Sequence, residues 1–214
     1  MILLEEFRKK VHEDYKNLGI GDEEPYKNCV KRRDVWDDLS KMDASFITNV
    51  AIPFLKNWGC ERPGKFKAED LARALREIDP LLKPFRTLDI ASANIFEPLE
   101  PSGKETYVLI EEVAEQLRSA KVRENGRALG FTTMSKLLHM CVPEFFVMCD
   151  ESIREKYGCA ANGKGYANFM IRMSLLARDL LRQAKENKDL ICKHNGESLR
   201  LTKVLDQYNY AITR

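Results

Sequence analysis

The sequence has no long hydrophobic run. Hydrophobic residues make up 44% of the 214 positions, yet no window of about 18 residues is both apolar and uncharged, so no membrane-spanning helix is predicted. The segment Met-Ile-Leu-Leu-Glu-Glu-Phe-Arg at positions 1–8 also lacks the positive stretch and apolar run that mark a secretory signal. We therefore expect a cytoplasmic location and no membrane partner.

Paired cysteines are also absent. The six cysteines are scattered, and none belongs to a C-x-x-C pair, which predicts reduced thiols, several of them in the core. His139 and Cys141 lie two positions apart on an expected helix and point in different directions, which argues against zinc binding together with Cys149. With three histidines in the chain, no Ser-His-Asp order stands out. We expect no metal and no cofactor.

Strand patterns and a marked charge excess are missing as well. No run of alternating β-branched residues occurs, and the Asn125-Gly126 pair has a helical pattern on each side, so no hairpin is predicted. The formal net charge of +2 neither requires nor excludes a nucleic-acid partner, because binding faces are local. The fold class that remains is all-α, a compact multi-helix domain.

Helical spacing of apolar residues recurs along the chain. The expected helices cover residues 2–18, 67–78, 107–117, 166–183 and 198–210. A further helix follows Asp43 and is expected to kink or break at Pro53. Prolines punctuate residues 80–101, which makes this stretch the best candidate for a long loop or a junction between an N-terminal helical region, 1–100, and a C-terminal helical region, 101–214. The two regions form either two helical subdomains or one domain.

The most informative stretch starts at a glycine-marked turn. Gly126 and Gly130 bracket a short turn between two helical patterns, and backbone N–H groups at such a turn, with a helix N-terminus behind it, can bind a phosphate. Basic residues surround it, namely Arg118, Lys121, Arg123, Arg127 and Lys136. The pattern fits a contact with a phosphate backbone, and it equally fits an ordinary helix–helix turn with solvated side chains.

The helix after this turn leads to an aspartate. It begins at Thr132 or Thr133, carries Lys136, and is expected to end at Pro143. A very apolar run follows, and then Asp150 opens the next helix. Asp150 is therefore either a plain N-cap or a carboxylate at the edge of an apolar cluster, where a raised pKa suits a general base.

A lysine on a helix, an apolar run with proline and an aspartate at the next helix start resemble the helix-hairpin-helix DNA glycosylases. The resemblance covers 129–150 and is carried by Gly130, Lys136 and Asp150; of the family's Gly-x-Gly hairpin only Gly130 is present. It implies a helix-hairpin-helix-like unit that grips DNA, with Asp150 assisting removal of a flipped base. It also implies that Lys136 is a Schiff-base nucleophile if the protein cuts the strand.

A second glycine pattern follows at 158–165, which has the G-x-x-x-x-G-K spacing of a phosphate-binding loop. Gly165 replaces the Ser or Thr that binds magnesium, and no buried strand precedes the pattern, so a loop followed by a helix start is the better interpretation. Lys164 and Tyr166 remain candidates for contact with a ligand or a nucleic-acid backbone.

Two hypotheses of function remain. The first is a nucleic-acid-binding helical protein, a DNA glycosylase that removes a damaged base, with DNA as its partner. Its catalytic residues are Asp150 and Lys136, and its nucleic-acid contacts are Arg123, Arg127, Gly130 and Lys164. The alternative is a non-catalytic helical protein-interaction module, in which residues 125–166 form core and turn.

Overall fold

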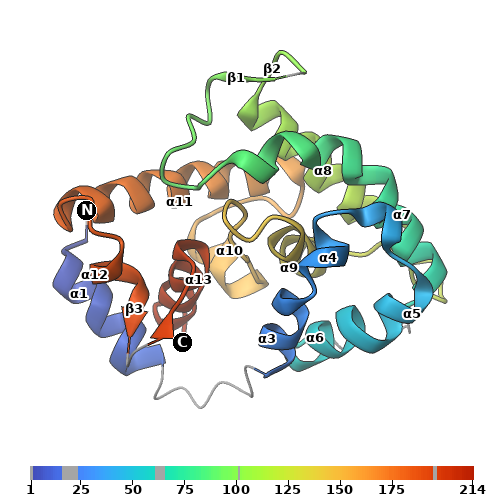
Figure 1. Cartoon of the computed structure of the whole chain (residues 1–214), viewed down its shortest axis with the longest axis horizontal. Coiled ribbons are helices and arrows are strands. Elements are labelled where there is room, and N and C mark those ends of the chain that lie inside the picture. The colour runs from blue at the N-terminus through green and yellow to red at the C-terminus, as the bar shows by residue number, and fades with distance from the viewer. Residues whose placement is uncertain (1, 16–23, 61–65, 101, 195–196) are drawn as a thin grey trace.

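The chain folds into an all-α structure, as predicted. The computed structural model describes residues 2–15, 24–60, 66–100, 102–194 and 197–214. In Figure 1 the two longest C-terminal helices, α8 (Thr106–Ser119) and α11 (Gly163–Gln183), run side by side along one edge. The remaining helices pack beneath them, with α9 (Phe131–Cys141) and α13 (Leu201–Ala211) in the middle of the molecule.

The other elements are short. The N-terminal elements are α1 (Leu4–Lys9), the π-helical η1 (Lys10–Asp14), α3 (Glu24–Lys31), α4 (Arg33–Trp36), the 3-10 turn η2 (Leu39–Lys41), α5 (Ala44–Phe46), the π-helical η3 (Ile47–Ala51), α6 (Ile52–Asn57), α7 (Ala68–Leu82) and the 3-10 segment η4 (Lys83–Thr87). The C-terminal part adds α10 (Glu151–Lys156) and α12 (Asp189–Cys192). Two antiparallel pairs of two-residue strands complete the described elements, β1 (Pro98–Leu99) with β2 (Lys104–Glu105) and β3 (Lys193–His194) with β4 (Glu197–Ser198).

Proline positions explain where the observed helices differ from the expected ones. Helix α7 runs on to Leu82 through Pro80. The proline removes one hydrogen bond, and only Leu81 and Leu82 follow it in the helix, so little of the helix depends on the interrupted turn. Before Pro53 the backbone is π-helical over Ile47–Ala51, a local adjustment of the helical ladder next to a residue that cannot donate. The N-terminal helix is described as far as Tyr15, and the rest of its expected span lies outside the described residues.

The start of α11 depends on two glycines, Gly163 against α8 and Gly165 against the preceding loop. A Cβ atom on Gly163 would lie 2.4 Å from the Glu111 carbonyl oxygen, and one on Gly165 would lie 1.9 Å from the Ala160 carbonyl oxygen. The side chain of Asn162 caps the helix by accepting a hydrogen bond from the Gly165 amide at 2.8 Å. The Gly-Lys-Gly sequence therefore allows close backbone approach at a helix start, which confirms the loop-and-helix interpretation of this stretch.

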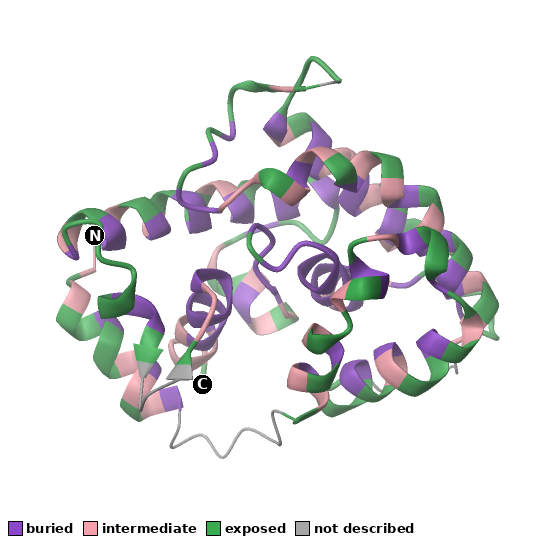
Figure 2. Cartoon of the chain, in the orientation of Figure 1, coloured by how far each residue is buried: buried purple, intermediate pink, exposed green. Residues whose placement is uncertain are grey.

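The core is continuous across both predicted regions. Helix α7 packs on α8, and η1 packs on α13, so the regions 1–100 and 101–214 contact one another. In Figure 2, α9 and α13 are buried on nearly every side. A helix surrounded by neighbours has no solvent face, so any polar residue on it must find its partner inside the protein. Helix α13 carries several such residues, and they form the site described next.

Candidate functional site

The Gly130 turn is tied to the end of α8. The connection from α8 to α9 spans 120–130, and the Gly130 amide donates to the Arg118 carbonyl at 3.2 Å. Gly130 has φ +87°, and Gly126 has φ +71°, a backbone region that other residues adopt at a cost. The Gly130 amide already has a partner within the protein. The contact between Gly130 and a phosphate therefore stays a prediction.

The basic residues around this turn have different environments. Arg118 forms an ion pair with Glu115, with Nε 3.0 Å from Oε2. Arg123 is buried, its guanidinium lies 4.4 Å from the centre of the Phe66 ring, and burial lowers its pKa. Arg127 is exposed at the turn. Of the predicted backbone contacts, Arg123 thus supports packing of the connection, whereas Arg127 remains accessible to a phosphate.

Lys164 and Tyr166, the two candidate contact residues at the start of α11, also differ in their exposure to solvent. Lys164 lies in the first turn of α11 and is exposed. Tyr166 is fully buried, and its hydroxyl donates to the Val147 carbonyl at 2.8 Å. Lys164 can therefore reach a ligand, whereas the candidate Tyr166 cannot, because its ring is part of the core.

Lys136 points into the protein. It lies on α9 and is 5% exposed, and its Nζ donates to the Trp58 carbonyl at the end of α6. The Cys60 sulfur lies 3.6 Å from the same nitrogen. An ammonium group this deeply buried is costly unless hydrogen bonds and nearby carboxylates compensate for the lost water.

Asp150 is the N-cap of α10, as predicted. Its Oδ1 accepts a hydrogen bond from the Ile153 amide at 2.8 Å, and its Oδ2 lies 3.7 Å from the Arg214 guanidinium. The carboxylate is partly buried, with the side chain 18% exposed. One oxygen therefore serves the cap and the other faces Arg214, on a side chain that retains limited solvent access.

A buried carboxylate, Asp206, links these residues. Asp206 lies on α13, with its Oδ2 3.3 Å from the Nζ of Lys203 one turn earlier, and both side chains are buried. Burial raises the pKa of Asp206, the positive charges of Lys203 and Lys136 lower it, and the negative charge of Asp150 raises it. Lys136 and Asp150 therefore both lie near enough for their charges to act on the Asp206 carboxylate, whereas its direct partner is Lys203. We call Lys136, Asp150, Lys203 and Asp206 the polar core.

Sequence reasoning missed Lys203 and Asp206. The only signal is their spacing of three positions on a helix that also carries Thr202, Gln207 and Asn209, and such a polar set is typical of a solvent-facing side when the neighbours are unknown. In the structure the Lys203 Nζ lies 3.9 Å from the Trp58 ring centre and 4.9 Å from that of Tyr26. Such cation–π contacts partly replace the lost hydration of the ammonium group.

His139 fixes the position of Tyr26. Its Nδ1 lies 2.7 Å from the Phe146 carbonyl oxygen, which can only accept, so Nδ1 carries the proton. The other nitrogen, Nε2, therefore accepts from the Tyr26 hydroxyl at 3.0 Å, and the two rings stack at 5.8 Å. Burial lowers the pKa of His139 to about 3, so the imidazole is neutral at physiological pH.

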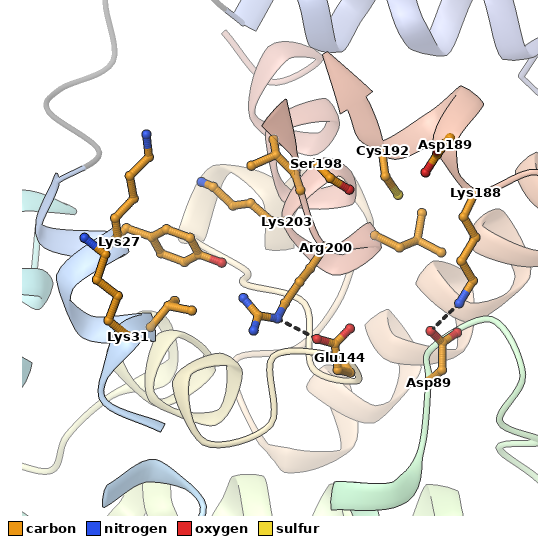
Figure 3. A pocket seen from close by; sticks show the side chains of 14 residues that line it. Lys27, Lys31, Asp89, Glu144, Lys188, Asp189, Cys192, Ser198, Arg200 and Lys203 are labelled. Carbon is orange, nitrogen blue, oxygen red and sulfur yellow. Dashed lines mark hydrogen bonds and ion pairs between the residues drawn. The ribbon is translucent and has the colours of Figure 1, made fainter. Parts of the chain in front are cut away.

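An open pocket of about 840 Å³ adjoins the polar core. It lies between α3 and the α12–α13 segment, as Figure 3 shows. Five cationic side chains contribute to its lining, Lys27, Lys31, Lys188, Arg200 and Lys203. Because Lys203 belongs to both the lining and the polar core, the pocket and the core share one wall.

Comparison with known protein families, curated proteins and solved structures found no match. Within the described residues, no helix is long and apolar enough to cross a membrane. The same part of the chain contains no group of three or more His, Cys, Asp or Glu residues placed to hold a metal ion. All six cysteines are free and buried. The site must therefore be interpreted from its own chemistry.

Proposed function

We propose that the chain binds nucleic acid and removes a base from it, with Lys136 and Asp150 as the catalytic residues. The observation that carries the proposal is the polar core, in which two buried ammonium groups and two carboxylates lie beside a basic pocket. Buried charges reduce stability unless compensated, so their concentration at one place is more typical of a functional site than of a scaffold.

The chemistry of the polar core suits base removal. Asp150 accepts the proton that the Lys136 ammonium must lose before it can react. The neutral amine then attacks C1′ of the extruded nucleotide, the bond from C1′ to the base breaks, and the base leaves with the electron pair. If Lys136 stays on the Trp58 carbonyl, water activated by Asp150 attacks C1′ instead. Arg127, Lys164 and the Gly130 turn contact the phosphate backbone in this proposal.

The test is a screen of base excision on duplexes that carry different lesions, with borohydride trapping of covalent intermediates alongside. Asp150→Asn keeps a capping oxygen but loses the base, so we expect excision to be abolished with little change in stability. Lys136→Gln should abolish trapping. Lys156→Gln, on the exposed end of α10, is the matched control and should behave as wild type.

The stability of the Asp150→Ala variant distinguishes the capping role of Asp150 from its proposed catalytic role. Loss of an N-cap costs about 1 kcal/mol of the free energy of unfolding, and urea unfolding measures that loss whether or not the protein is an enzyme. If the wild type excises a base and Asp150→Asn excises it equally well, the assignment of Asp150 is wrong. Inactivity of the wild type on every lesion would refute the proposed base excision altogether.

A non-catalytic interaction module is the second candidate, and exposed apolar side chains favour it. Phe96 is 61% exposed and Leu175 is 57% exposed, whereas Lys136 and the cap oxygen of Asp150 already have partners within the fold. Under this function, Phe96→Ser or Leu175→Ser abolishes association with a partner protein, and the polar core serves stability alone.

A further inference from the structure

Cys60 is held in a fixed place just after α6. The Cys60 amide donates to the Leu55 carbonyl at 2.9 Å, and the Gly59 amide donates to the Lys56 carbonyl at 3.0 Å. Gly59 has φ +74°. Two such hydrogen bonds around a left-handed glycine are the Schellman ending of a helix. The backbone that carries the Cys60 sulfur is therefore anchored to α6.

The Lys136 amine meets this sulfur from α9. Its Nζ atom lies 3.6 Å from the Cys60 Sγ, and the same nitrogen donates to the Trp58 carbonyl at the end of α6. Reacting atoms held about 3–3.5 Å apart are close to the geometry of attack. Only a small movement of either side chain is thus needed to bring nitrogen and sulfur together.

Positive charge lies on two sides of the Cys60 sulfur. Besides the Lys136 ammonium, the Arg123 guanidinium is close enough to interact with it, since burial lowers the pKa of Arg123 and a Cys60 thiolate raises it. Neighbouring cations favour the thiolate, the form of cysteine that reacts with peroxides. Hydrogen peroxide is little larger than water, so the 6% exposure of Cys60 limits it less than it limits a bulky thiol reagent.

Cys159 is the best comparison within the chain, because it has the same 6% exposure. Burial raises the pKa of its thiol, and the positive charges of Arg172 and Arg154 lower it. Its sulfur lies 3.6 Å from the Tyr157 carbonyl oxygen, which is not a nitrogen nucleophile. Among the described residues, Cys60 is the cysteine whose sulfur contacts a lysine amine.

We propose that Cys60 and Lys136 form a covalent sulfur–nitrogen cross-link when the protein meets hydrogen peroxide. The Cys60 thiolate attacks one peroxide oxygen, the O–O bond breaks, and a sulfenic acid forms. The departing hydroxide takes a proton from the Lys136 ammonium and becomes water, which leaves a neutral amine beside the oxidised sulfur.

The second step is a condensation. The Lys136 nitrogen attacks the Cys60 sulfur, the S–O bond breaks, and the hydroxyl group leaves as water with a proton from nitrogen, as in the known condensation of sulfenic acids with backbone nitrogen. One peroxide is thus reduced to two waters, and the cysteine and lysine together lose two electrons.

The cross-link occupies the amine to which the proposed function assigns base removal. This consequence rests on the proposed function, whereas the cross-link itself does not. Oxidised protein should lose borohydride trapping on a lesion that the reduced protein processes. Dithiothreitol should restore it, because a thiolate that attacks the sulfur releases the amine.

The experiment treats the reduced protein with hydrogen peroxide, alkylates the remaining thiols and digests the unfolded chain with trypsin for mass spectrometry. Trypsin cannot cut after a modified lysine. We therefore expect loss of cleavage after Lys136, and a Cys60 peptide joined to the uncut segment with two hydrogens fewer than the separate peptides. Dithiothreitol added before digestion should restore the cleavage.

Three variants test the assignment of the two atoms. Cys60→Ser should abolish the cross-link, and Cys159→Ser, which removes a thiol of equal exposure, should leave it unchanged. Lys136→Arg keeps the positive charge but has no primary amine, so Cys60 should remain a sulfenic acid that dimedone labels. The wild-type digest decides the question by itself if a variant fails to fold.

Three results overturn the inference. The first is cleavage after Lys136 that is as complete with peroxide as without it. The second is a disulfide of Cys60, which leaves the bond after Lys136 open to trypsin. The third is a cross-link of Lys136 that persists in Cys60→Ser.

The outcome of this experiment is separate from that of the lesion screen. Cross-linking in a protein that excises no lesion supports the inference and refutes the proposed activity. Excision by a protein whose Lys136 stays open to trypsin after peroxide treatment does the reverse. Each result therefore identifies which of the two proposals has failed.

Discussion

A single buried imidazole makes the stability of this protein depend on pH. His139 is neutral in the folded state with a pKa of about 3, whereas an unfolded histidine has a pKa of about 6.5. Between these values the unfolded chain binds a proton that the folded chain does not bind. Stability from this residue is therefore fully present above about pH 6.5 and is lost as the pH falls towards 3.

The prediction is a difference between two unfolding curves. From pH 6.5 to pH 5 the wild type should lose about 2 kcal/mol more of its free energy of unfolding than His139→Gln, because each pH unit in this window costs about 1.4 kcal/mol. Urea unfolding followed by circular dichroism at several pH values measures both. Asp206 is present in both proteins, so its contribution to the difference cancels. If the free energies of unfolding of the two proteins change in parallel with pH, His139 is not held neutral.

At the residue scale, the sequence predicts the local roles of residues better than it predicts which side chains are buried. The N-cap function of Asp150 follows from an aspartate ahead of a helical pattern, and the structure confirms it. The inward direction of Lys136 and the pairing of Lys203 with Asp206 do not follow, since helical periodicity says which residues share a face but not what covers that face. Helix α13 is covered on nearly every side, so its charged residues became core residues.

At the scale of elements, two glycines shape the start of α11, where Gly163 faces α8 and Gly165 faces the preceding loop. Gly163 and Gly165 leave no room for a Cβ atom beside the Glu111 and Ala160 carbonyls. Phosphate-binding loops and close helix contacts both require a residue without a side chain, so glycine spacing alone cannot distinguish them. The missing Ser or Thr at position 165 was the informative signal in the sequence.

We predict that Gly165→Ala destabilises the protein by about 3 kcal/mol, at the upper end of the usual cost of overpacking, because backbone rather than a flexible side chain must move. Gly126→Ala is the matched control. Gly126 differs in having a positive φ of +71° and open space around it, so backbone strain alone should cost about 1–2 kcal/mol. The free energies of unfolding in urea test both, and equal losses would contradict the steric explanation.

At the scale of the whole molecule, the thiols report on global unfolding. Each of the six cysteines is at most 6% exposed, and burial raises the pKa of both Cys29 and Cys141 to about 12. Thiolates, which are the reactive form, are therefore rare as well as inaccessible in the native state.

The expected result is that Ellman's reagent modifies fewer than one thiol per native molecule within minutes and all six in urea. The rate of the slow native reaction should follow the population of open states. Rapid modification of two or more thiols in native protein would contradict the burial described here. Fewer than six thiols in urea would contradict the prediction of reduced cysteines.

The position of α13 constrains the order in which this protein can be made. Residues 201–211 contact the N-terminal η1 and supply Lys203 to the rings of Tyr26 and Trp58. A ribosome synthesises the first helices long before α13, so their apolar faces have no final partner for most of translation. The nascent chain must remain soluble in that interval, by its own charged faces or with the help of a chaperone, and a messenger truncated before residue 201 should give an aggregation-prone product.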